Sequence, residues 1–254
     1  MTEAHSADEA LDAPPPLDLR ATSLFLDLDG TIAPLEPAPQ DVGPDRDRRR
    51  LLDALRAELD GRLAVVSGRT LADLDRVLEG RIPALGAVHG LVRRSADGRV
   101  CQSAGAGAVH EAVVDFRAFA AADRRLLVED KGVAVTLHYR QAPEAAAAAR
   151  DVGRRLAGRL GLRALEGDMV IELRAQGPDK GGAVAAFMTE PPFAGFTPIF
   201  VGDDLTDEDG FRAARRLGGY GIIAGARRPS DASFALGGVE AVRAWLAAAV
   251  GRSV

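Results

Sequence analysis

A short run near the start of the chain, Leu24-Phe-Leu-Asp27-Leu-Asp29-Gly30-Thr31, places two carboxylates directly after three apolar residues. Residues i and i+2 of an extended strand point to the same side, so Asp27 and Asp29 would leave the carboxyl end of a buried strand together. Open α/β sheets bind their ligands at that edge. Two neighbouring carboxylates repel each other and need a cation, a proton or a separate role for each. A metal-dependent phosphate site meets this need, and a solvated D-x-D-G turn is the alternative.

Strand-like and helix-like segments alternate along most of the chain. Apolar strands are expected at 23–28, 63–66, 197–201 and 220–223, and helical patterns at 45–59, 70–78, 179–188, 205–217 and 239–249. This β-α-β order predicts a parallel, doubly wound sheet.

The middle of the chain follows another order. Helical patterns cover 107–122 and 143–160, and strands are expected at 126–129, 133–140, 162–166 and 169–174. The order α-β-β-α-β-β predicts a small α+β module inserted into the larger sheet. The expected fold class is therefore α/β, with a doubly wound core formed by 21–105 and 177–254. Residues 106–176 form the insert, and residues 1–20 are expected to be a disordered tail.

Charge and cysteine content limit the partners. The formal net charge is −5, with acidic and basic residues interspersed, which argues against nucleic acid as the main partner. Cys101 is the single cysteine, so no internal disulfide is possible and a reducing cytoplasm is the default location. No run approaches the roughly 18 apolar residues of a membrane span. The expectation is a monomer that acts on a small molecule.

Three further motifs follow strands in the order shown by the haloacid-dehalogenase superfamily of phosphatases, which the chain resembles. The D-x-D-G-T motif of that superfamily is matched by Asp27 to Thr31. The other three are matched by Ser67-Gly68-Arg69, by Asp179-Lys180-Gly181-Gly182 and by Gly202-Asp203-Asp204-Leu-Thr-Asp207. Each motif alone has a structural explanation, such as an N-cap serine, a surface lysine or a capping acid. Their fixed order favours the family.

The resemblance implies a role for each motif. Asp27 is the expected nucleophile, and Asp29 is the expected acid and base. The expected cofactor is Mg²⁺, held by Asp27, Asp203 and the backbone carbonyl of Asp29, with Asp204 and Asp207 orienting its surroundings. The phosphoryl oxygens would be held by Ser67 and Lys180, with further contacts from Gly30, Thr31, Gly68 and Arg69. Arg69 could contact the phosphate or pair with a core acid.

The strands of the insert alternate in character. One face of 133–140 carries Val133, Val135, Leu137 and Tyr139, and the other carries Thr136, His138 and Arg140. In 169–174 the polar pair Glu172 and Arg174 shares a face with Val170. A two-layer module buries its apolar faces under its helices. The polar faces are then left for solvent or for a polar substrate.

These polar positions carry a narrower resemblance, to trehalose-6-phosphate phosphatases. Glu129-Asp-Lys131-Gly, His138-Tyr139-Arg140 and Val170-Ile-Glu172-Leu-Arg174 match cap segments of that family, and His89-Gly90 matches its H-G pair. The resemblance implies a C2-type cap, with sugar hydroxyls bound by Glu129, Lys131, Arg140 and Glu172 beside His138 and Tyr139. It also implies trehalose 6-phosphate as substrate. Many members have Lys where this chain has Asp168, which removes one expected cation.

Other functions fit parts of this pattern. A phosphatase for sucrose 6-phosphate, mannosyl-3-phosphoglycerate or a hexose phosphate would share the core motifs without the cap segments. A non-catalytic trehalose-phosphate-binding regulator would be expected to lack a motif acid, whereas Asp27, Asp29, Lys180 and Asp203 are all present. A phosphomutase would keep the phosphate on the sugar.

Overall fold

The computed structural model describes residues 11–36, 39–167, 169–226 and 229–251, which divide into two compact units. The larger unit combines the chain up to Val100 with Asp179 onward, and the smaller unit spans Cys101–Pro178. The expected insert, 106–176, lies within the smaller unit. No helix in the described ranges is long and apolar enough to cross a membrane.

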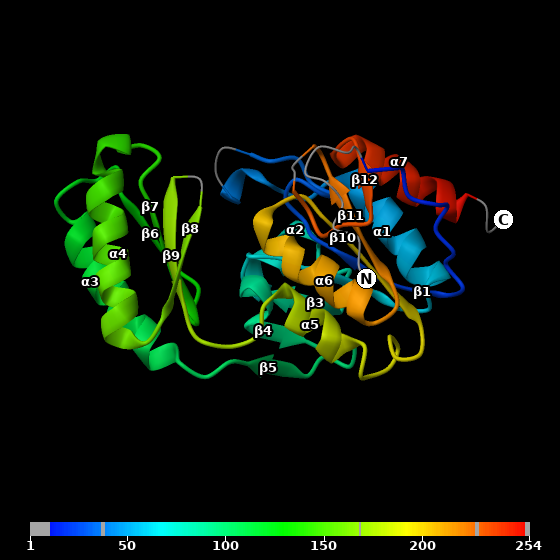
Figure 1. Cartoon of the computed structure of the whole chain (residues 1–254), viewed down its shortest axis with the longest axis horizontal. Coiled ribbons are helices and arrows are strands. Elements are labelled where there is room, and N and C mark those ends of the chain that lie inside the picture. Colours follow the sequence, from blue (N-terminus) through cyan, green and yellow to red (C-terminus); the bar gives the residue numbers. More distant parts are fainter. Residues whose placement is uncertain (1–10, 37–38, 168, 227–228, 252–254) are drawn as a thin grey trace, which may run out of the picture. The chain divides into compact units, whose positions relative to one another are not determined.

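The larger unit is built on an eight-stranded sheet in the order β12-β11-β10-β1-β2-β3-β4-β5 (Figure 1). Its strands are β1 (Thr22–Leu26), β2 (Leu63–Val66), β3 (Ala84–Ala87), β4 (Val92–Arg94), β5 (Val100–Gln102), β10 (Thr197–Gly202), β11 (Tyr220–Ala224) and β12 (Phe234–Leu236). The strands from β12 to β3 pair in parallel, whereas β4 runs antiparallel to β3. The parallel, doubly wound sheet expected from the sequence is confirmed.

The helices of this unit connect the strands. They are α1 (Arg46–Glu58), α2 (Leu71–Val77), α5 (Lys180–Phe187), α6 (Glu208–Arg216) and α7 (Val239–Val250), with short 3₁₀ turns at Pro39–Asp41, Val88–Gly90 and Leu205–Asp207. Phenylalanines fill the space between the sheet and the pair α5 and α6. Phe25 of β1, for example, stacks on Phe193 with ring centroids 5.4 Å apart. This packing fixes α5 and α6 against β1 and β10.

Part of the expected disordered tail is packed. Leu17 and Leu19 are buried. The Trp245 indole N–H donates to the Pro15 carbonyl at 2.9 Å, and the Ala235 amide donates to the Asp12 carbonyl at 3.0 Å. Residues 11–20 are therefore part of the larger unit, because these apolar side chains and carbonyls find partners on it.

The smaller unit has a four-stranded antiparallel sheet in the order β6-β7-β9-β8. Its elements are α3 (Ala106–Ala120), β6 (Leu127–Asp130), β7 (Ala134–His138), α4 (Ala146–Leu160), β8 (Arg163–Gly167) and β9 (Val170–Arg174), with a 3₁₀ turn at Pro143–Ala145. Helices α3 and α4 cover one face of this sheet (Figure 1). Val135, Leu137, Ile171 and Leu173 are fully buried, so the predicted apolar faces are packed.

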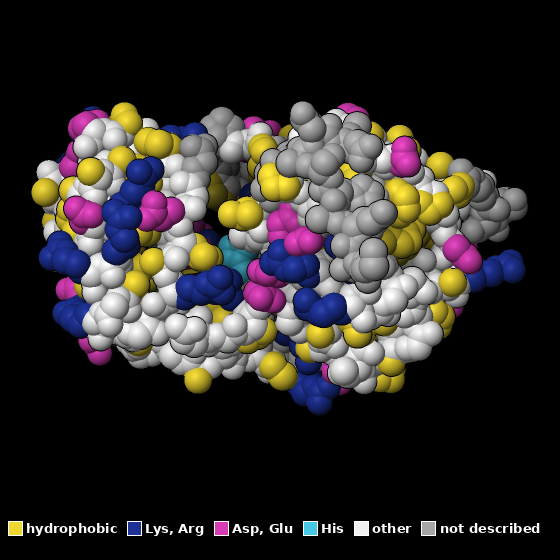
Figure 2. All heavy atoms as spheres, in the orientation of Figure 1, with side chains coloured by type: hydrophobic (Ala, Val, Ile, Leu, Met, Phe, Trp, Pro, Cys, Tyr) yellow, Lys and Arg dark blue, Asp and Glu magenta, His cyan; other side chains and the backbone are white. Residues whose placement is uncertain are grey.

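Acidic and basic side chains alternate over both units on the face shown in Figure 2. Exposed charged side chains of the larger unit form ion pairs, such as Arg212 with Asp209 and Asp231. Such exposed pairs contribute little to stability, roughly 0–1 kcal/mol each. Their mixture agrees with the interspersed charges of the sequence.

Candidate functional site

The carboxyl ends of β1 and β10 bring two motifs together. These strands are parallel neighbours, with Leu26 opposite Val201. The Asp27 amide continues the pairing by donating to the Val201 carbonyl at 2.9 Å, which leaves its side chain at the sheet edge beside the loop that begins at Asp203. Asp27 is buried and Asp203 is half-buried. The first and fourth motifs thus share one site, as their positions after strands predicted.

Lys180 reaches the same place from the first residue of α5. Its Nζ donates to Asp27 Oδ1 at 2.9 Å and to Asp207 Oδ1 at 2.6 Å, and its side chain is buried. The Asp179 carboxylate caps the helix by accepting from the Gly182 amide, which fixes the start of α5 and hence the Lys180 backbone. The lysine is therefore an internal cation between two acids.

Asp207 organises the loop of the fourth motif. Its Oδ2 accepts from the amides of Asp203 and Asp204 at 2.9 and 3.0 Å, and it is completely buried. A Cβ at position 202 would lie 2.2 Å from the Asp207 Cγ, so only Gly202 allows this carboxylate to fold back under the loop. Both Asp207 oxygens already have partners. Asp207 thus serves mainly to hold Lys180 and the loop.

Asp203 lies against the turn that follows β1. The Thr31 hydroxyl is 3.4 Å from Asp203 Oδ1. Gly30 has φ +77°, and a Cβ there would lie 2.1 Å from Asp203 Oδ2. Only a glycine satisfies both the left-handed backbone and the close approach of the carboxylate.

Three carboxylates of this site can hold a metal ion. One oxygen each from Asp27, Asp203 and Asp207 lies within 4.8 Å of the other two, a grouping found among the described residues. Carboxylate oxygens are the ligands that hard divalent cations prefer. The donor set therefore fits a divalent cation, with Asp27 and Asp203 better placed as direct ligands because Asp207 is bonded to Lys180 and two amides.

Burial dominates the electrostatics of these groups. Burial and the charges of the neighbouring acids raise the pKa of Asp27 well above its ordinary value, although Lys180 opposes the shift. Burial and the charge of Asp207 raise the pKa of Asp203 to about 7, and burial raises that of Asp207 to about 6. Burial would lower the pKa of Lys180, but Asp207 and Asp27 outweigh it and raise the pKa, so Lys180 stays protonated.

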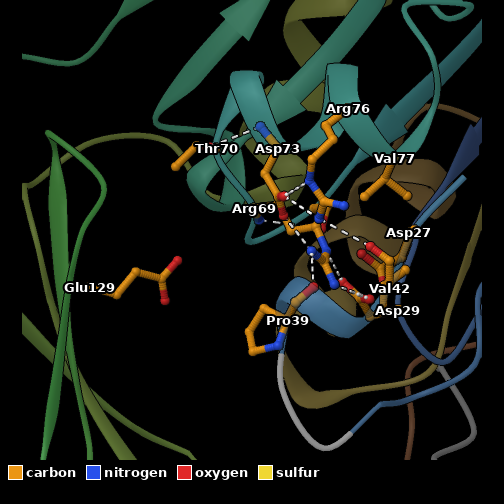
Figure 3. A network of polar contacts seen from close by, with 12 residues as sticks. Asp27, Asp29, Pro39, Val42, Arg69, Thr70, Asp73, Arg76, Val77 and Glu129 are labelled. Carbon is orange, nitrogen blue, oxygen red and sulfur yellow. Dashed lines mark hydrogen bonds and ion pairs between the residues drawn. The ribbon is translucent and has the colours of Figure 1, made fainter.

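The second motif, at the end of β2, lies beside Asp29. The Arg69 guanidinium donates two hydrogen bonds to the Asp29 carboxylate, from Nε to Oδ2 at 2.7 Å and from Nη2 to Oδ1 at 2.8 Å (Figure 3). Ser67 is buried, and its hydroxyl lies 3.4 Å from the Arg69 amide. Of the two partners left open for Arg69, the structure shows the core acid. The sequence-based assignment of Arg69 as a phosphate ligand stays a prediction beside this observed pairing.

Two other predicted phosphate contacts, Gly30 and Thr31, lie in the turn after β1. The Gly30 amide donates to the Ala33 carbonyl at 2.8 Å, and the Thr31 amide donates to the Leu28 carbonyl at 3.3 Å. These amides close the turn after β1 and are engaged there. Gly30 and Thr31 thus shape the site around Asp203, and donation to the phosphate stays a prediction.

His89 is a site residue whose part the sequence motifs did not specify. Val88 and His89 both have positive φ, +48° and +54°, which is unusual for non-glycine residues. Their amides donate to the carbonyls of Arg69 and Ser67, both at 2.9 Å. A Cβ on Gly68 would lie 2.5 Å from the His89 ring, so the imidazole lies directly on the second motif. The strained turn braces that loop, and its signal in the sequence was the His-Gly pair after β3.

The smaller unit carries its own polar cluster. Strand register sets Glu129, Thr136 and Glu172 side by side across β6, β7 and β9. Lys131 Nζ and Thr136 Oγ1 donate to Glu172 Oε2 at 2.9 and 3.0 Å, and His138 Nε2 lies 3.1 Å from Glu129 Oε2. Burial opposes ionisation of Glu129, but His138 and Lys131 outweigh it and lower its pKa. The face of this sheet away from α3 and α4 thus carries a charged, hydrogen-bonded cluster.

Three further residues that the sequence analysis singled out in this unit are Tyr139, Arg140 and Asp168. Tyr139 is fully buried, and its hydroxyl accepts from Arg150 Nε at 3.1 Å, so its assignment to substrate binding is corrected: it packs on the helix side of the sheet. Arg140 follows β7 and is exposed. Asp168, which replaces the lysine of many relatives, lies outside the described residues.

Comparison with known proteins places the chain among phosphatases. The family model described as trehalose-phosphatase matches residues 25–239. Trehalose-6-phosphate phosphatase of Escherichia coli (strain K12) is 38% identical over 224 residues, which cover 87% of this chain and 84% of the relative. A probable trehalose-phosphate phosphatase of Sinorhizobium fredii is 39% identical over 236 residues, covering 91% and 88%. The crystal structure of a trehalose-6-phosphate phosphatase related protein superposes with a TM-score of 0.78 at 26% identity, covering 91% of this chain and 97% of that one.

Proposed function

The chain belongs to the trehalose-phosphatase family, and on that premise we propose that it hydrolyses trehalose 6-phosphate to trehalose and inorganic phosphate. The observation that carries the proposal is the buried Asp27 carboxylate, held by Lys180 at 2.9 Å and surrounded by Asp203 and Asp207. A carboxylate in such a site can act as a nucleophile toward phosphorus and later be restored.

The first step forms a phospho-enzyme. An Asp27 oxygen attacks phosphorus while the bond from phosphorus to the sugar oxygen breaks, and the departing oxygen takes a proton from Asp29. Lys180 stays protonated and lies beside Asp27, so its Nζ neutralises charge on the transferred phosphoryl group. The Ser67 hydroxyl, at the end of the neighbouring β2, is proposed as a second phosphoryl contact.

The second step restores the enzyme. Water attacks the phosphorus of phospho-Asp27, the Asp29 carboxylate takes its proton, and the bond between phosphorus and the Asp27 oxygen breaks to release phosphate. Asp29 thus serves as acid and then as base, which requires a fixed position within hydrogen-bond reach of both oxygens.

Mg²⁺ is the proposed cofactor, held by Asp27, Asp203 and the Asp29 backbone carbonyl, because hard oxygen ligands suit it. Bound there, it would supply positive charge to the phosphoryl oxygens. Asp207 and Asp204 would support this site by holding the loop that carries Asp203. Asp207 does so by holding the amides of the loop, and Asp204 by accepting from the Thr206 amide at 2.7 Å.

Metal affinity is expected to rise with pH up to about 7. Because burial and neighbouring acids raise the pKa of Asp203 to about 7, the metal must displace a proton below that pH. Affinity for Mg²⁺ should then fall about tenfold per pH unit below 7 for each proton displaced. Isothermal titration calorimetry between pH 5.5 and 8, in two buffers of different ionisation enthalpy, measures both affinity and proton release. A flat affinity across this range would contradict the prediction.

The polar face of the smaller unit is the proposed sugar-binding surface. Glu129, Lys131, His138, Arg140 and Glu172 offer charged donors and acceptors on a rigid sheet, which suits the hydroxyl groups of a pyranose. Buried Thr136 adds a hydroxyl that fixes Glu172. A sugar that can satisfy this surface would be distinguished from one that leaves its groups without partners.

The function is tested by phosphate release from trehalose 6-phosphate, sucrose 6-phosphate, glucose 6-phosphate and mannosyl-3-phosphoglycerate with Mg²⁺. We expect kcat/KM to be about a hundredfold higher for the first, roughly 2.7 kcal/mol of differential transition-state binding. Protein carrying Asp27→Asn serves as the blank. Equal slow rates on all four substrates would support the phosphatase chemistry and overturn the assignment of the sugar.

A further inference from the structure

Behind the Asp29–Arg69 pair lies a second pair of charges that the proposed reaction does not use. The Arg69 side chain is 7% exposed, and its Nη1 donates to the Pro39 carbonyl at 2.8 Å and to the Asp73 carboxylate. Asp73 lies on α2, four residues after Arg69. Its other oxygen accepts from Arg76 Nε at 3.0 Å and from Arg76 Nη2 at 2.6 Å. The four side chains form a row of alternating charges (Figure 3).

Asp73 and Arg76 are each held by a further hydrogen bond. The Asp73 amide donates to the Thr70 hydroxyl at 3.2 Å in the cap of α2, which fixes the Asp73 backbone. Arg76 Nη2 also donates to the Val42 carbonyl at 3.0 Å. Together with the bond from Arg69 to Pro39, this ties the loop that follows the first motif to α2. The position of the Arg69 fork is therefore set by groups on two elements.

The geometry points to Asp73 and Arg76 as positioning residues for Asp29 in the phosphatase reaction proposed above. An arginine side chain has many rotamers, and holding one of them costs conformational entropy. Asp73 fixes the outer nitrogen of the guanidinium, so the two remaining donor groups meet Asp29 in the planar, two-point geometry that a carboxylate favours.

The two hydrogen bonds from Arg69 leave the Asp29 carboxylate able to exchange a proton. A carboxylate offers about four lone-pair sites, and Arg69 occupies two of them. The other sites remain for the groups that exchange the proton, first the sugar oxygen and then water. The hydrogen bonds from the two arginines also explain why Asp73 is ionised. Burial opposes ionisation of Asp73, but its bonds from Arg69 and Arg76 outweigh that effect and lower its pKa, so it remains an anion beside Arg69.

A second ion pair on the same helix provides a matched control. Asp75 makes a two-point pair with Arg94, Nη1 to Oδ2 and Nη2 to Oδ1, both at 2.8 Å. Arg94 also donates to the carbonyls of Pro83 and Ile82, at 2.9 and 3.1 Å. This pair fastens α2 to the segment around β3, and its hydrogen bonds among the described residues do not involve Asp29 or Arg69. Loss of an aspartate from α2 can thus be separated from loss of the support of Arg69.

The test compares Asp73→Asn with Asp75→Asn on two esters. Trehalose 6-phosphate needs a proton on its departing alkoxide, whereas p-nitrophenyl phosphate releases a stable anion without one. For Asp73→Asn we expect kcat/KM to fall about 10- to 100-fold on the sugar ester, a fraction of the effect of a general acid. The fall on p-nitrophenyl phosphate should be at least about fivefold smaller. Asp75→Asn should lower both values by less than about threefold, and Asp73→Glu should recover part of the loss.

Equal losses on the two esters, or equal losses in the two variants, would overturn the inference, because a general distortion of the unit would act on both. Thermal unfolding of each variant confirms that folded proteins are compared. If the wild-type enzyme prefers another sugar phosphate, the proposed substrate fails. The comparison of that sugar ester with p-nitrophenyl phosphate then still decides the part played by Asp73.

Discussion

The Asp27→Asn variant is expected to release no measurable phosphate, a loss of about 10⁴-fold or more, and at the same time to unfold at a higher temperature than the metal-free wild type. The activity is lost because an amide oxygen is a poor nucleophile and a poor metal ligand. Stability rises because burial and neighbouring acids raise the pKa of Asp27, so its ionised form is disfavoured in the folded protein. Removal of one negative charge beside Asp203 and Asp207 relieves that cost.

The sign of the pH dependence follows from the direction of this shift. A carboxyl group whose folded-state pKa is raised binds its proton more tightly in the folded state than in the unfolded state. Ionisation therefore costs stability as the pH rises above the unfolded value of about 3.9. The advantage of the Asp27→Asn variant should be absent near pH 4 and present at pH 8, where each kcal/mol recovered raises Tm by about 2–4 °C.

Bound Mg²⁺ is expected to favour the wild type over the Asp27→Asn variant in thermal stability. Mg²⁺ should raise the Tm of the wild type by mass action and have much less effect on Asp27→Asn, because one ligand is missing. Differential scanning calorimetry of both proteins at pH 4 and pH 8, with and without MgCl₂, measures these effects. A variant that loses both activity and metal-free stability would indicate that Asp27 is a structural residue, against the nucleophile proposed here.

The site was partly readable from the sequence because its first and fourth motifs each follow a strongly apolar strand. Asp27 and Asp203 come directly after such strands, so the rules for parallel sheets bring them together. The partner of Arg69 could not be predicted from the sequence in this way. Its partner Asp29 is forty residues away, and a choice between phosphate and acid depends on side-chain geometry that spacing does not encode.

The misses in the fold have equally local causes. Strand β3, Ala84-Leu-Gly-Ala, has a single large apolar residue, and it is a strand because β2 and β4 pair with it on either side. Residues 11–20 show no periodicity, yet Leu17 and Leu19 are buried by tertiary contacts. Tyr139 was correctly placed on the apolar face by alternation, and its assignment to substrate binding came from the family segment around it.

The Gly30→Ala variant is expected to fold but to lose at least about 100-fold in affinity for Mg²⁺ and more in kcat/KM, because the added Cβ occupies the place of Asp203. That Cβ would lie 2.1 Å from Asp203 Oδ2 and 2.4 Å from its Cγ, distances that no contact between these atoms permits. The carboxylate must move, and it is one of the two acids best placed to bind the metal directly. Thr31, whose hydroxyl lies near Asp203, would lose that contact as well.

Gly80→Ala separates this effect from backbone strain. Gly80 also has positive φ, +64°, but a Cβ there would meet nothing within 4 Å. Both variants place an alanine in the left-handed region, which costs about 1–2 kcal/mol. Only Gly30→Ala also displaces a carboxylate. Thermal unfolding should therefore show similar destabilisation in the absence of metal, whereas calorimetric titration with Mg²⁺ should show weakened binding for Gly30→Ala alone. Weakened binding in both variants would attribute the loss to strain and would contradict the role given to Asp203.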